Sequence, residues 1–592
     1  PYMRPIPIGA SAAMMFSMVI AFVATPWAAY QILGRAFAKG KLKAHHEGER
    51  EDFLTRLYRS YMNPLIRNAK VRHIFLWALG GLLLASMALV PLKLVRMKML
   101  PFDNKNEFQV ILNMPDGTAI EKTREVITEI ADYLVTVPEV KDVELYAGCA
   151  APYNFNGLVR HYFLRSRPHQ ADLQVNLAGK HDRKRQSHDI AKAVRPRIHE
   201  IVRTHGGHVQ VAEVPPGPPV LSTLVLEIYG PSREGQNGLA REIERLLASS
   251  EGVTDIDTYV QAPEKLARLR VNTEKASLNG IPVDQVAEAV ATAIGGKTVD
   301  LAHLSEEYEP VEILLRLPRE KRATLDSVLN MTLLSRYGNP IPVRELVDIE
   351  SGTKDLATYH KNLMRVSYVL ADVAGRFESP AYAILKLKKD IAKIPAPENH
   401  EGQKTLDQLF NGQPRSADRW TVKWDGEWQI TFEVFRDLGI AFAFVLLLIY
   451  ALVVGWFQSF KTPWIIMLPI PLTLIGILPA HWLGGVFFTA TSMIGMIAGA
   501  GIVVRNSIIL VDFIELQRAA GMPLEEAVVD AGAKRFRPML LTAAAVVVGA
   551  AVILFDPIFQ GLAVSLMAGE IASTVLSRTA VPVFYYMMAE KT

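Results

Sequence analysis

Four ionisable side chains stand inside long apolar stretches near the C-terminal end, where they could carry protons or ions across a membrane. Arg505 lies about 12 Å from the nearer end of its stretch, at roughly 1.5 Å per helical residue, and Asp512 follows on the same helical face. Glu570 and Arg578 share one side of the last stretch. A guanidinium near a helix centre costs about 2.5 to 3.5 kcal/mol, so a carboxylate or a water cavity should face Arg505. The four residues predict either a proton relay or a structural set of ion pairs that only fixes helix packing.

A hydroxyl and a basic side chain of the next-to-last apolar stretch could extend such a relay. Thr542 stands one helical turn beyond Pro538 and below the basic pair Arg535 and Arg537. A hydroxyl at this place often hydrogen-bonds back to its own helix, so a structural role for Thr542 stays open beside the functional one.

The sequence lacks the motifs of nucleotide-binding proteins, common hydrolases and cysteine-based metal sites. The sequence contains no nucleotide-binding GxxxxGK[ST], no HExxH, no GxSxG and only one cysteine, Cys149, so we expect no catalytic residues, no metal ligands and no cofactor. The group His45, His46 and Glu47 lies among charges and is expected to be solvated. With 64 basic and 60 acidic side chains the net charge is only +4, which gives no reason to expect nucleic acid as a partner.

The elements that must position these residues are membrane helices. Of the 592 residues 50% are hydrophobic and 21% are charged, so the chain should be part membrane and part soluble. About 20 apolar residues cross a bilayer, and the sequence predicts seven such spans. They are residues 1–34, 72–92 and, within residues 436–592, residues 438–460, 462–480, 487–513, 538–555 and 558–587. The chain opens with Pro1 and has no charged segment before its first apolar stretch, so we expect a cut and not a signal peptide.

Basic residues of the short connections predict the orientation of the chain. The connection between the first two spans, counted from Arg35 to Arg72 and assigned to residues 35–71 as a domain, contains or borders ten of them, namely Arg35, Lys39, Lys41, Lys43, Arg50, Arg56, Arg59, Arg67, Lys70 and Arg72. Lys461 and the basic residues between spans five and six fall on the same side, which should be cytoplasmic. The long segment between spans two and three then lies in the periplasm of a bacterial cell. Within the connection, residues 53–68 alternate apolar and basic positions and predict either an amphipathic helix on the inner membrane surface or a solvated helix.

The long soluble segment contains a repeated strand–helix–strand unit. EVKDVELY from Glu139 and GVTDIDTY from Gly252 have Val, Asp and Tyr in the same places. Each unit is followed by a further strand and helix, so we predict two ferredoxin-like split βαβ modules. The first module is residues 93–213. The second is residues 214–260 and 354–435, interrupted by an inserted subdomain at 261–353.

Several motifs of the chain resemble the resistance-nodulation-division (RND) transporters, most closely the acriflavine-resistance or hydrophobe/amphiphile efflux branch. These are VVRNSIILVDF from Val503, GMPLEEAVVDAGAKRFRPMLLTAAA from Gly521, LPFDNKNEFQVILNMPDGTAIEKT from Leu100, EKASLNGIPVDQVAEAV from Glu274 and ATPWAAY from Ala24. The resemblance implies the C-terminal part of a twelve-helix pump: helices six to twelve, two porter subdomains and a docking insert. The first five helices and the first periplasmic loop would be absent.

The resemblance also implies roles for single residues. The family takes up protons on acids of its fourth helix that face a basic residue of the tenth, and Arg505 falls on that basic position, where lysine is usual. A guanidinium does not deprotonate in proteins, so Arg505 would be a fixed cation that holds a carboxylate ionised until protonation releases it. Arg535 and Thr542 fall on relay positions of the eleventh helix.

The resemblance implies a proton-driven inner-membrane efflux permease for amphipathic organic molecules. It would be a homotrimer that works with a periplasmic adaptor protein and an outer-membrane channel, powered by the proton motive force. A metal-efflux branch uses three methionines in the periplasmic cleft, and only Met114 falls near such a position. We therefore expect amphipathic organic cargo rather than metal ions. A non-transporting membrane scaffold is the alternative. The residues that line the substrate path are not predicted.

Overall fold

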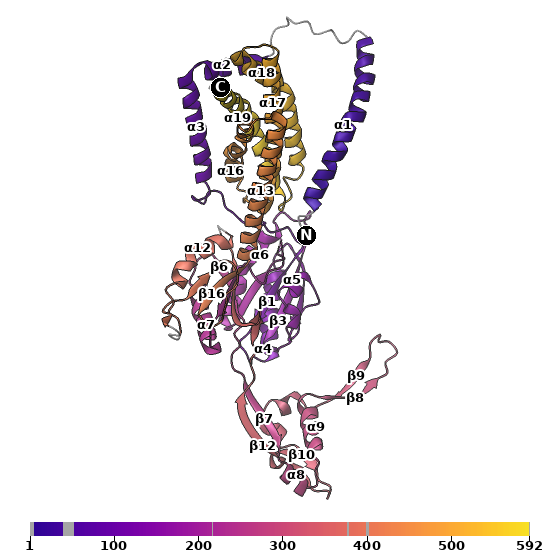
Figure 1. Ribbon diagram of the computed structural model, residues 1–592. Coiled ribbons are helices and arrows are strands. Elements are labelled where there is room, and N and C mark those ends of the chain that lie inside the picture. Colours follow the sequence, from indigo (N-terminus) through magenta and orange to yellow (C-terminus); the bar gives the residue numbers. More distant parts are fainter. Residues whose placement is uncertain (1–4, 39–52, 216, 376–377, 398–401, 591–592) are drawn as a thin grey trace.

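The computed structural model is elongated and describes residues 5–38 and 53–590, apart from residues 216, 376–377 and 398–401. Figure 1 shows three tiers: helices at one end, two α/β modules in the middle and a slender insert at the far end. Lys39, Lys41, Lys43 and Arg50 of the predicted cytoplasmic connection lie outside the described residues, as does the group at residues 45–47.

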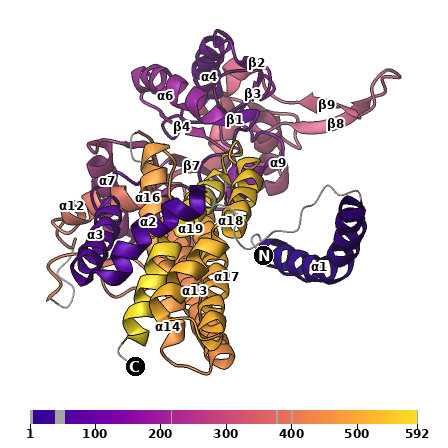
Figure 2. The same ribbon diagram turned by 90° about the horizontal axis from the view of Figure 1, so that it is seen from above.

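The helical tier combines segments from both ends of the sequence. Its helices are α1 (Pro5–Ala38), α2 (Phe53–Arg67), α3 (Ala69–Ala88), α13 (Glu427–Phe457), α14 (Thr462–Met467), α15 (Pro469–Leu472), α16 (Leu474–Leu483), α17 (Ala490–Ala519), α18 (Leu524–Ala551) and α19 (Gln560–Ala589). Seen from above, α1 stands apart from the other helices (Figure 2). The remaining helices share an apolar core.

Five described segments are long and apolar enough to cross a membrane: Ile8–Arg35, Ala69–Ala88, Glu427–Phe457, Thr462–Leu483 and Ala490–Ala519. The predicted count of seven is therefore not confirmed, because α18 and α19 are not among them. They are helices of 28 and 30 residues that pack in the same core as α17. The first half of α18 is rich in charged residues, and α19 contains Glu570, Arg578 and several serines and threonines.

The sixth predicted span, which starts at Pro538, is the second half of a longer helix. Helix α18 begins at Leu524 and continues through Pro538. The charged first half is helical because its apolar face is covered: Val528, Ala531 and Gly532 are buried. Packing against the rest of the tier therefore outweighs the backbone hydrogen bond that a proline removes.

Helix α2 covers that first half of α18. Its Tyr58 and Met62 side chains are fully buried, and Leu65 and Ile66 are at most 7% exposed. The Tyr58 hydroxyl donates a 2.9 Å hydrogen bond to the Arg578 carbonyl of α19. The apolar face of α2 thus packs on protein, which corrects the expectation that it lies on a membrane surface or is solvated. A Cβ atom at Gly532 would lie 1.9 Å from the Tyr58 hydroxyl, so this approach requires glycine.

The first soluble module has the predicted split βαβ topology. Its sheet has the strand order β2-β3-β1-β4, and β1 pairs antiparallel with β3 from Glu107↔Asn176 to Asn113↔Gln170. Helices α4 and α6 share one apolar core with the sheet. The elements are β1 (Glu107–Asn113), α4 (Ile120–Val135), β2 (Val140–Ala147), α5 (Phe155–Val159), η1 (Tyr162–Leu164), β3 (Gln170–Leu177), α6 (Ser187–Thr204) and β4 (His208–Ala212).

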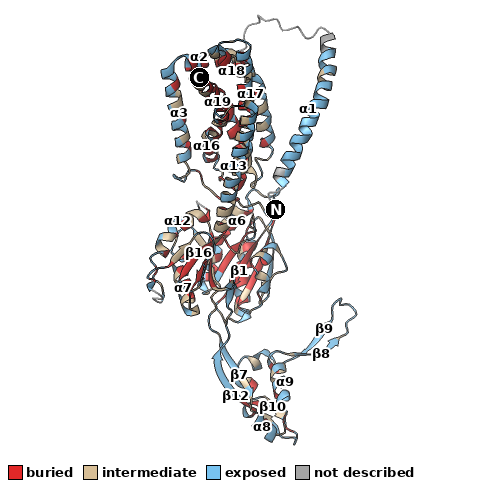
Figure 3. Cartoon of the chain, viewed as in Figure 1, coloured by how far each residue is buried: buried red, intermediate tan, exposed pale blue. Residues whose placement is uncertain are grey.

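The second module repeats this order. In its sheet β14 pairs with both β5 and β6, and β16 pairs with β5. The repeated octapeptides form the second strand of each module, β2 and β6, as predicted. Trp420 and Trp424 are fully buried in its core, and red sheets in both modules mark the two cores in Figure 3. The elements are β5 (Leu224–Tyr229), α7 (Arg233–Ala248), β6 (Val253–Thr258), β13 (Tyr359–Lys361), β14 (Met364–Val373), α12 (Pro380–Ile391), β15 (Asp407–Leu409) and β16 (Thr421–Gly426).

The insert lies between β6 and β14 and is joined to the second module by the antiparallel pair β7 and β12. Its β8–β9 hairpin projects sideways (Figure 1) and is exposed along both strands. The elements are β7 (Lys265–Val271), α8 (Thr273–Leu278), α9 (Val283–Ile294), β8 (Lys297–Ala302), β9 (Val311–Leu315), η2 (Arg319–Arg322), α10 (Leu325–Leu329), β10 (Thr332–Leu334), β11 (Pro340–Pro342), α11 (Val343–Leu346) and β12 (Val347–Thr353).

The contact between α2 and α18 can be tested at Gly532. Gly532→Ala should lower the free energy of unfolding by about 1 to 3 kcal/mol, because the added methyl group overlaps the Tyr58 hydroxyl. Gly549→Ala in the same helix is the control, since a Cβ atom there meets no atom within 4 Å. Thermal unfolding of the purified protein in detergent measures both changes. Equal unfolding midpoints for the two variants would contradict this packing.

Candidate functional site

The predicted intramembrane charges lie on three neighbouring helices, α17, α18 and α19. Helices α17 and α19 approach closely, since a Cβ atom at Gly495 of α17 would lie 2.8 Å from the Leu562 carbonyl oxygen of α19. The side of α19 that is buried contains polar groups, including Ser573, Thr574 and Ser577. The chain therefore builds a polar interface inside its helical tier.

Glu570 is the most deeply placed acid of this interface. Its side chain is 1% exposed, and its Oε1 atom accepts a long hydrogen bond of 3.4 Å from the Thr574 hydroxyl. The Glu570 Oε2 atom and the neighbouring Asn506 amide nitrogen are both buried without a hydrogen-bond partner among the described residues. A buried carboxylate with few hydrogen bonds is costly when it is ionised.

Arg505 lies within electrostatic reach of Glu570. It is exposed on α17, next to the buried Asn506, and forms no ion pair within 4 Å with any described residue. Asp512 is also exposed and follows Arg505 by seven residues, on the same face of α17. The structure thus places Glu570 near Arg505, as the sequence suggested, but does not bring their charged atoms into contact.

Arg578 does not join this group. Its guanidinium is 2% exposed and lies 4.3 Å from the centre of the Phe536 ring of α18. The Nε and Nη2 atoms have no hydrogen-bond partner within the described parts of the chain. Arg578 therefore faces α18 and α2, and the suggested pairing with the α17 charges is not present.

The two predicted relay residues of α18 have local contacts. The Arg535 guanidinium lies 4.6 Å from the centre of the Phe513 ring of α17. The Thr542 hydroxyl donates a 3.1 Å hydrogen bond to the carbonyl of Pro538 in its own helix, which is the structural alternative that the sequence left open.

Sequence reasoning missed an acid that ties three helices together. Asp530 of α18 accepts hydrogen bonds from Arg59 of α2 at 2.9 Å and from Gln517 of α17 at 2.6 Å, and it forms an ion pair with Lys534. It falls in the segment that was predicted to be a connection. The signal available in the sequence was its i,i+4 spacing to Lys534.

A cavity of about 440 Å³ lies between the two soluble modules. Met114, Arg165 and Tyr162 line it from the first module, and Tyr259 and Tyr359 line it from the second. Its walls therefore combine aromatic rings with charged groups.

One rim of this cavity brings together an imidazole and two carboxylates. The ligand atoms of Asp116, His169 and Glu264 all lie within 4.8 Å of one another, and His169 Nε2 lies 3.0 Å from an Asp116 oxygen. Burial lowers the pKa of His169, although Asp116 opposes this. No spacing in the sequence indicated this cluster, because its members are far apart along the chain.

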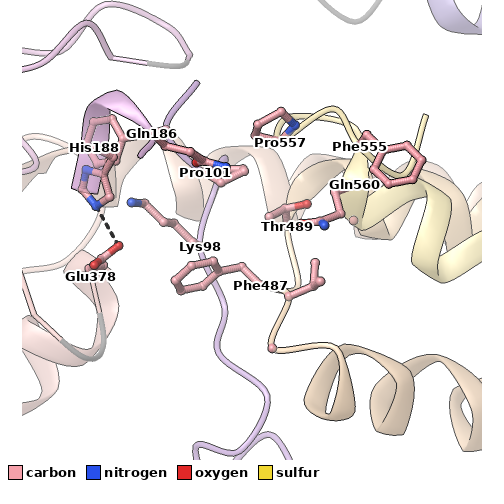
Figure 4. A pocket seen from close by; sticks show the side chains of 14 residues that line it. Lys98, Pro101, Gln186, His188, Glu378, Phe487, Thr489, Phe555, Pro557 and Gln560 are labelled. Atoms are coloured by element: carbon pink, nitrogen blue, oxygen red, sulfur yellow. Dashed lines mark hydrogen bonds and ion pairs between the residues drawn. The ribbon is translucent and has the colours of Figure 1, made fainter. Parts of the chain in front are cut away.

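A smaller pocket of about 220 Å³ lies where the modules meet the helical tier. Lys98, His188 and Glu378 line one side, and Phe487, which precedes α17, and Gln560, the first residue of α19, line the side of the helical tier (Figure 4). These residues come from five separate segments, so no spacing in the sequence pointed to them.

His188 of α6 is held between two carboxylates of this junction. Its Nδ1 atom lies 2.9 Å from Glu213, and its Nε2 atom lies 3.1 Å from Glu378 of the second module. Burial alone would lower the pKa of His188, but its two carboxylate hydrogen bonds raise it above the ordinary value. Burial opposes ionisation of Glu378, yet the bonds from His188 and Lys192 lower its pKa to about 2. We call these four residues the His188 clamp.

A known protein family matches nearly the whole chain, including the helices, the modules and the insert. Residues 2–589 match the AcrB/AcrD/AcrF family. The chain belongs to this family.

Relatives of this AcrB/AcrD/AcrF-family chain include the swarming motility protein SwrC of Bacillus subtilis. It is 22% identical over 98% of the chain and 51% of its own length. The cobalt-zinc-cadmium resistance protein CzcA of Cupriavidus metallidurans is 23% identical over 63% of the chain and 34% of its own length. The chain thus spans about half the length, or less, of these relatives.

Solved structures of a heavy metal efflux pump have the same fold. One crystal form matches with a TM-score of 0.72 at 22% identity, over 91% of the chain and 52% of the pump. The family is therefore the RND family that the sequence predicted, a family of transporters and not of enzymes. Its assignment to the hydrophobe/amphiphile branch is not supported over the metal branch, since relatives of both kinds match.

The His188 clamp should make stability depend on pH. Because the pKa of His188 is raised, its contribution is complete below about pH 6.5, the ordinary histidine value, and is lost as the pH rises through the raised pKa. The contribution of Glu378 is complete above its ordinary pKa of 4.5 and is lost as the pH falls toward 2. We therefore expect the thermal unfolding midpoint to fall as the pH rises from about 6 to 9.

His188→Gln should remove part of this fall, and His205→Gln is the matched control. His205 lies just after the same helix, and its Nε2 atom faces only Glu129 of the same module at 3.2 Å. A midpoint that changes with pH equally in the wild type and His188→Gln would contradict the charged clamp.

Proposed function

We propose that the chain forms the C-terminal portion of a proton-driven RND efflux permease that exports amphipathic organic compounds. The observation that carries the proposal is the buried, under-bonded Glu570 carboxylate within reach of Arg505. It lies in a helical tier that is joined to two modules with a cavity between them.

In this mechanism Arg505 is a fixed cation and Glu570 is a group that gains and loses the proton. An ionised Glu570 is attracted to Arg505, and protonation at Oε2 removes that attraction. Because the two residues lie on α17 and α19, the change alters the preferred positions of these helices. Asp512, Arg535 and Thr542 are proposed to lead protons to and from this pair.

The proposal includes the location and the partners of the whole pump. The soluble modules lie in the periplasm of a bacterial inner-membrane protein, and the pump is a homotrimer with a periplasmic adaptor and an outer-membrane channel. The projecting β8–β9 hairpin supports contact with another chain, since its Ile313, Leu314 and Leu315 side chains are 46 to 57% exposed. The aromatic and charged walls of the 440 Å³ cavity support amphipathic cargo.

Arg505→Ala and Glu570→Gln should each reduce proton-driven export at least about tenfold, because each removes one charge of the proposed pair. Export of a fluorescent amphipathic dye is measured in everted membrane vesicles that contain the whole pump. Arg537→Ala and Glu526→Gln are matched controls, since both residues are exposed on α18, and they should export at the wild-type rate.

Wild-type export by Arg505→Ala and Glu570→Gln would refute the coupling role of the pair. A wild-type protein that exports no dye and takes up no protons would instead favour the scaffold alternative.

The cluster of Asp116, His169 and Glu264 favours a second candidate, export of a divalent transition metal ion. One imidazole nitrogen and two carboxylates suit Zn²⁺, Co²⁺ or Ni²⁺. Asp116 is also oriented by a 2.7 Å hydrogen bond from the Ala262 backbone. Arg167 and Lys354 lie 3.5 and 3.2 Å from Glu264, so a metal would have to compete with two cations.

Isothermal titration of the purified chain with Co²⁺ and Zn²⁺ tests this candidate. His169→Gln and Glu264→Gln should each weaken binding at least about tenfold, since each removes a ligand. His208→Gln is the control, because His208 lines the same cavity outside the cluster. No saturable binding to the wild type, or equal binding by His169→Gln, would exclude metal at this place and leave amphipathic cargo.

A further inference from the structure

Residues 96–105, which we call the strap, lead from α3 to β1 and connect the helical tier to the first module. The start of the strap runs beside the segment that precedes α17. Met97 and Phe488 form a parallel bridge. Backbone hydrogen bonds join Phe488 N–H to the Arg96 carbonyl at 2.8 Å and Lys98 N–H to the Phe488 carbonyl at 3.2 Å. The strap is therefore tied to the element that leads directly into the Arg505 helix.

The tie continues into α17 itself. The N–H group of Ala490, the first residue of α17, donates a 3.1 Å hydrogen bond to the Met99 carbonyl of the strap. The Arg96 guanidinium adds a bond of 3.2 Å to the Gly485 carbonyl. Arg505 lies fifteen residues further along the same unbroken helix, about 22 Å away at roughly 1.5 Å per residue. A shift of α17 along its axis therefore acts on the strap.

The strap also contacts the second module. The Met97 N–H group donates a 3.1 Å hydrogen bond to the hydroxyl of Tyr382 in α12. Glu378 of the His188 clamp precedes α12 by two residues and has a positive φ of 28°, a strained conformation for a residue with a side chain. The clamp and Tyr382 thus hold the start of α12 from two sides.

The other end of the strap is fixed to α6 of the first module. The Ser187 hydroxyl donates a hydrogen bond of 3.3 Å to the Asp103 carbonyl and accepts one of 3.0 Å from the Lys105 N–H group. The ring of Phe102 stacks on His188 at 4.5 Å between centres and 17° between planes. The strap therefore ends on the same imidazole that joins the two modules.

We propose that the strap and the His188 clamp form the mechanical link that passes movement of α17 to the two soluble modules. This inference rests on the proposed function, for which α17 must move when Glu570 changes its proton. His188 acts as a positioning residue: it holds Glu213 of the first module and Glu378 of the second, and Phe102 sets its place.

Other ion pairs also join the two modules, beside the clamp. Arg195 of α6 contacts Asp255 at 3.0 Å, and Arg160 contacts Asp372 at 3.5 Å. Arg160, Arg195 and Asp372 line a small pocket together with Phe102 of the strap. The His188 clamp differs from these pairs because its imidazole stacks directly on the Phe102 ring.

Ala490→Pro tests the tie with little disturbance of α17. Proline is favoured at the first position of a helix, where the missing N–H group has no partner within the helix, and the extended Thr489 backbone suits a following proline. The substitution therefore removes the bond to Met99. Ala490→Val is the size control, since it retains the N–H group. We expect at least a fivefold fall in export for Ala490→Pro and at least half of wild-type export for Ala490→Val.

His188→Ala tests the joint, with His205→Ala as its control. We expect at least a tenfold fall in export for His188→Ala and wild-type export for His205→Ala. Proton uptake, measured with a pH-sensitive dye in the same vesicles, should stay at the wild-type level in Ala490→Pro and His188→Ala. A merely structural defect would lower both export and proton uptake, and that result would overturn the proposal.

Hydrogen–deuterium exchange of the whole protein separates this inference from the proposed function. Arg505→Ala should change the exchange of strap residues 96–105 and of residues 187–192 by at least twofold, and this change should be absent when Ala490→Pro is added. Such a result supports the link even if dye export fails. If Arg505→Ala alters exchange in the strap equally with and without Ala490→Pro, the link is refuted while the export function can stand.

Discussion

The burial of charge in the helical tier is the constraint on which the other features of this protein depend. A carboxylate at Glu570, 1% exposed, cannot be held between α17 and α19 without a proton, a cation or a full set of hydrogen bonds. Among the described residues, Thr574 gives this carboxylate one long hydrogen bond, and Arg505 is a cation at a distance. The proposed proton coupling rests on this shortage of partners.

This constraint explains why the soluble modules are fixed to α17 in particular. The strap is held by backbone hydrogen bonds at the start of α17 and by the Ser187 hydroxyl at the start of α6. The modules themselves have tightly packed cores around residues such as Trp420 and Ile198. They can therefore move as bodies, with the His188 clamp between them.

Much of the fold could be predicted from the sequence. Apolar runs located most long helices, and the repeat of EVKDVELY in GVTDIDTY indicated two modules of one topology. The predictions failed where tertiary packing outweighs local signals. Helix α18 continues through Pro538 because α2 covers its charged half, and α2 packs on protein because Gly532 admits Tyr58. The sequence also did not indicate that Arg578 is buried against α18 and α2, away from the charges of α17.

The sequence by itself determined which residue types stand in apolar surroundings, that the soluble part contains two repeated strand–helix–strand units, and which family the chain belongs to. These follow from local composition and spacing. The tertiary structure alone decided which side chains meet. Asp116, His169 and Glu264, or His188, Glu213 and Glu378, come from segments tens to hundreds of residues apart. Their meeting depends on strand order, helix packing and the path of the strap, and none of these leaves a fixed spacing in the chain.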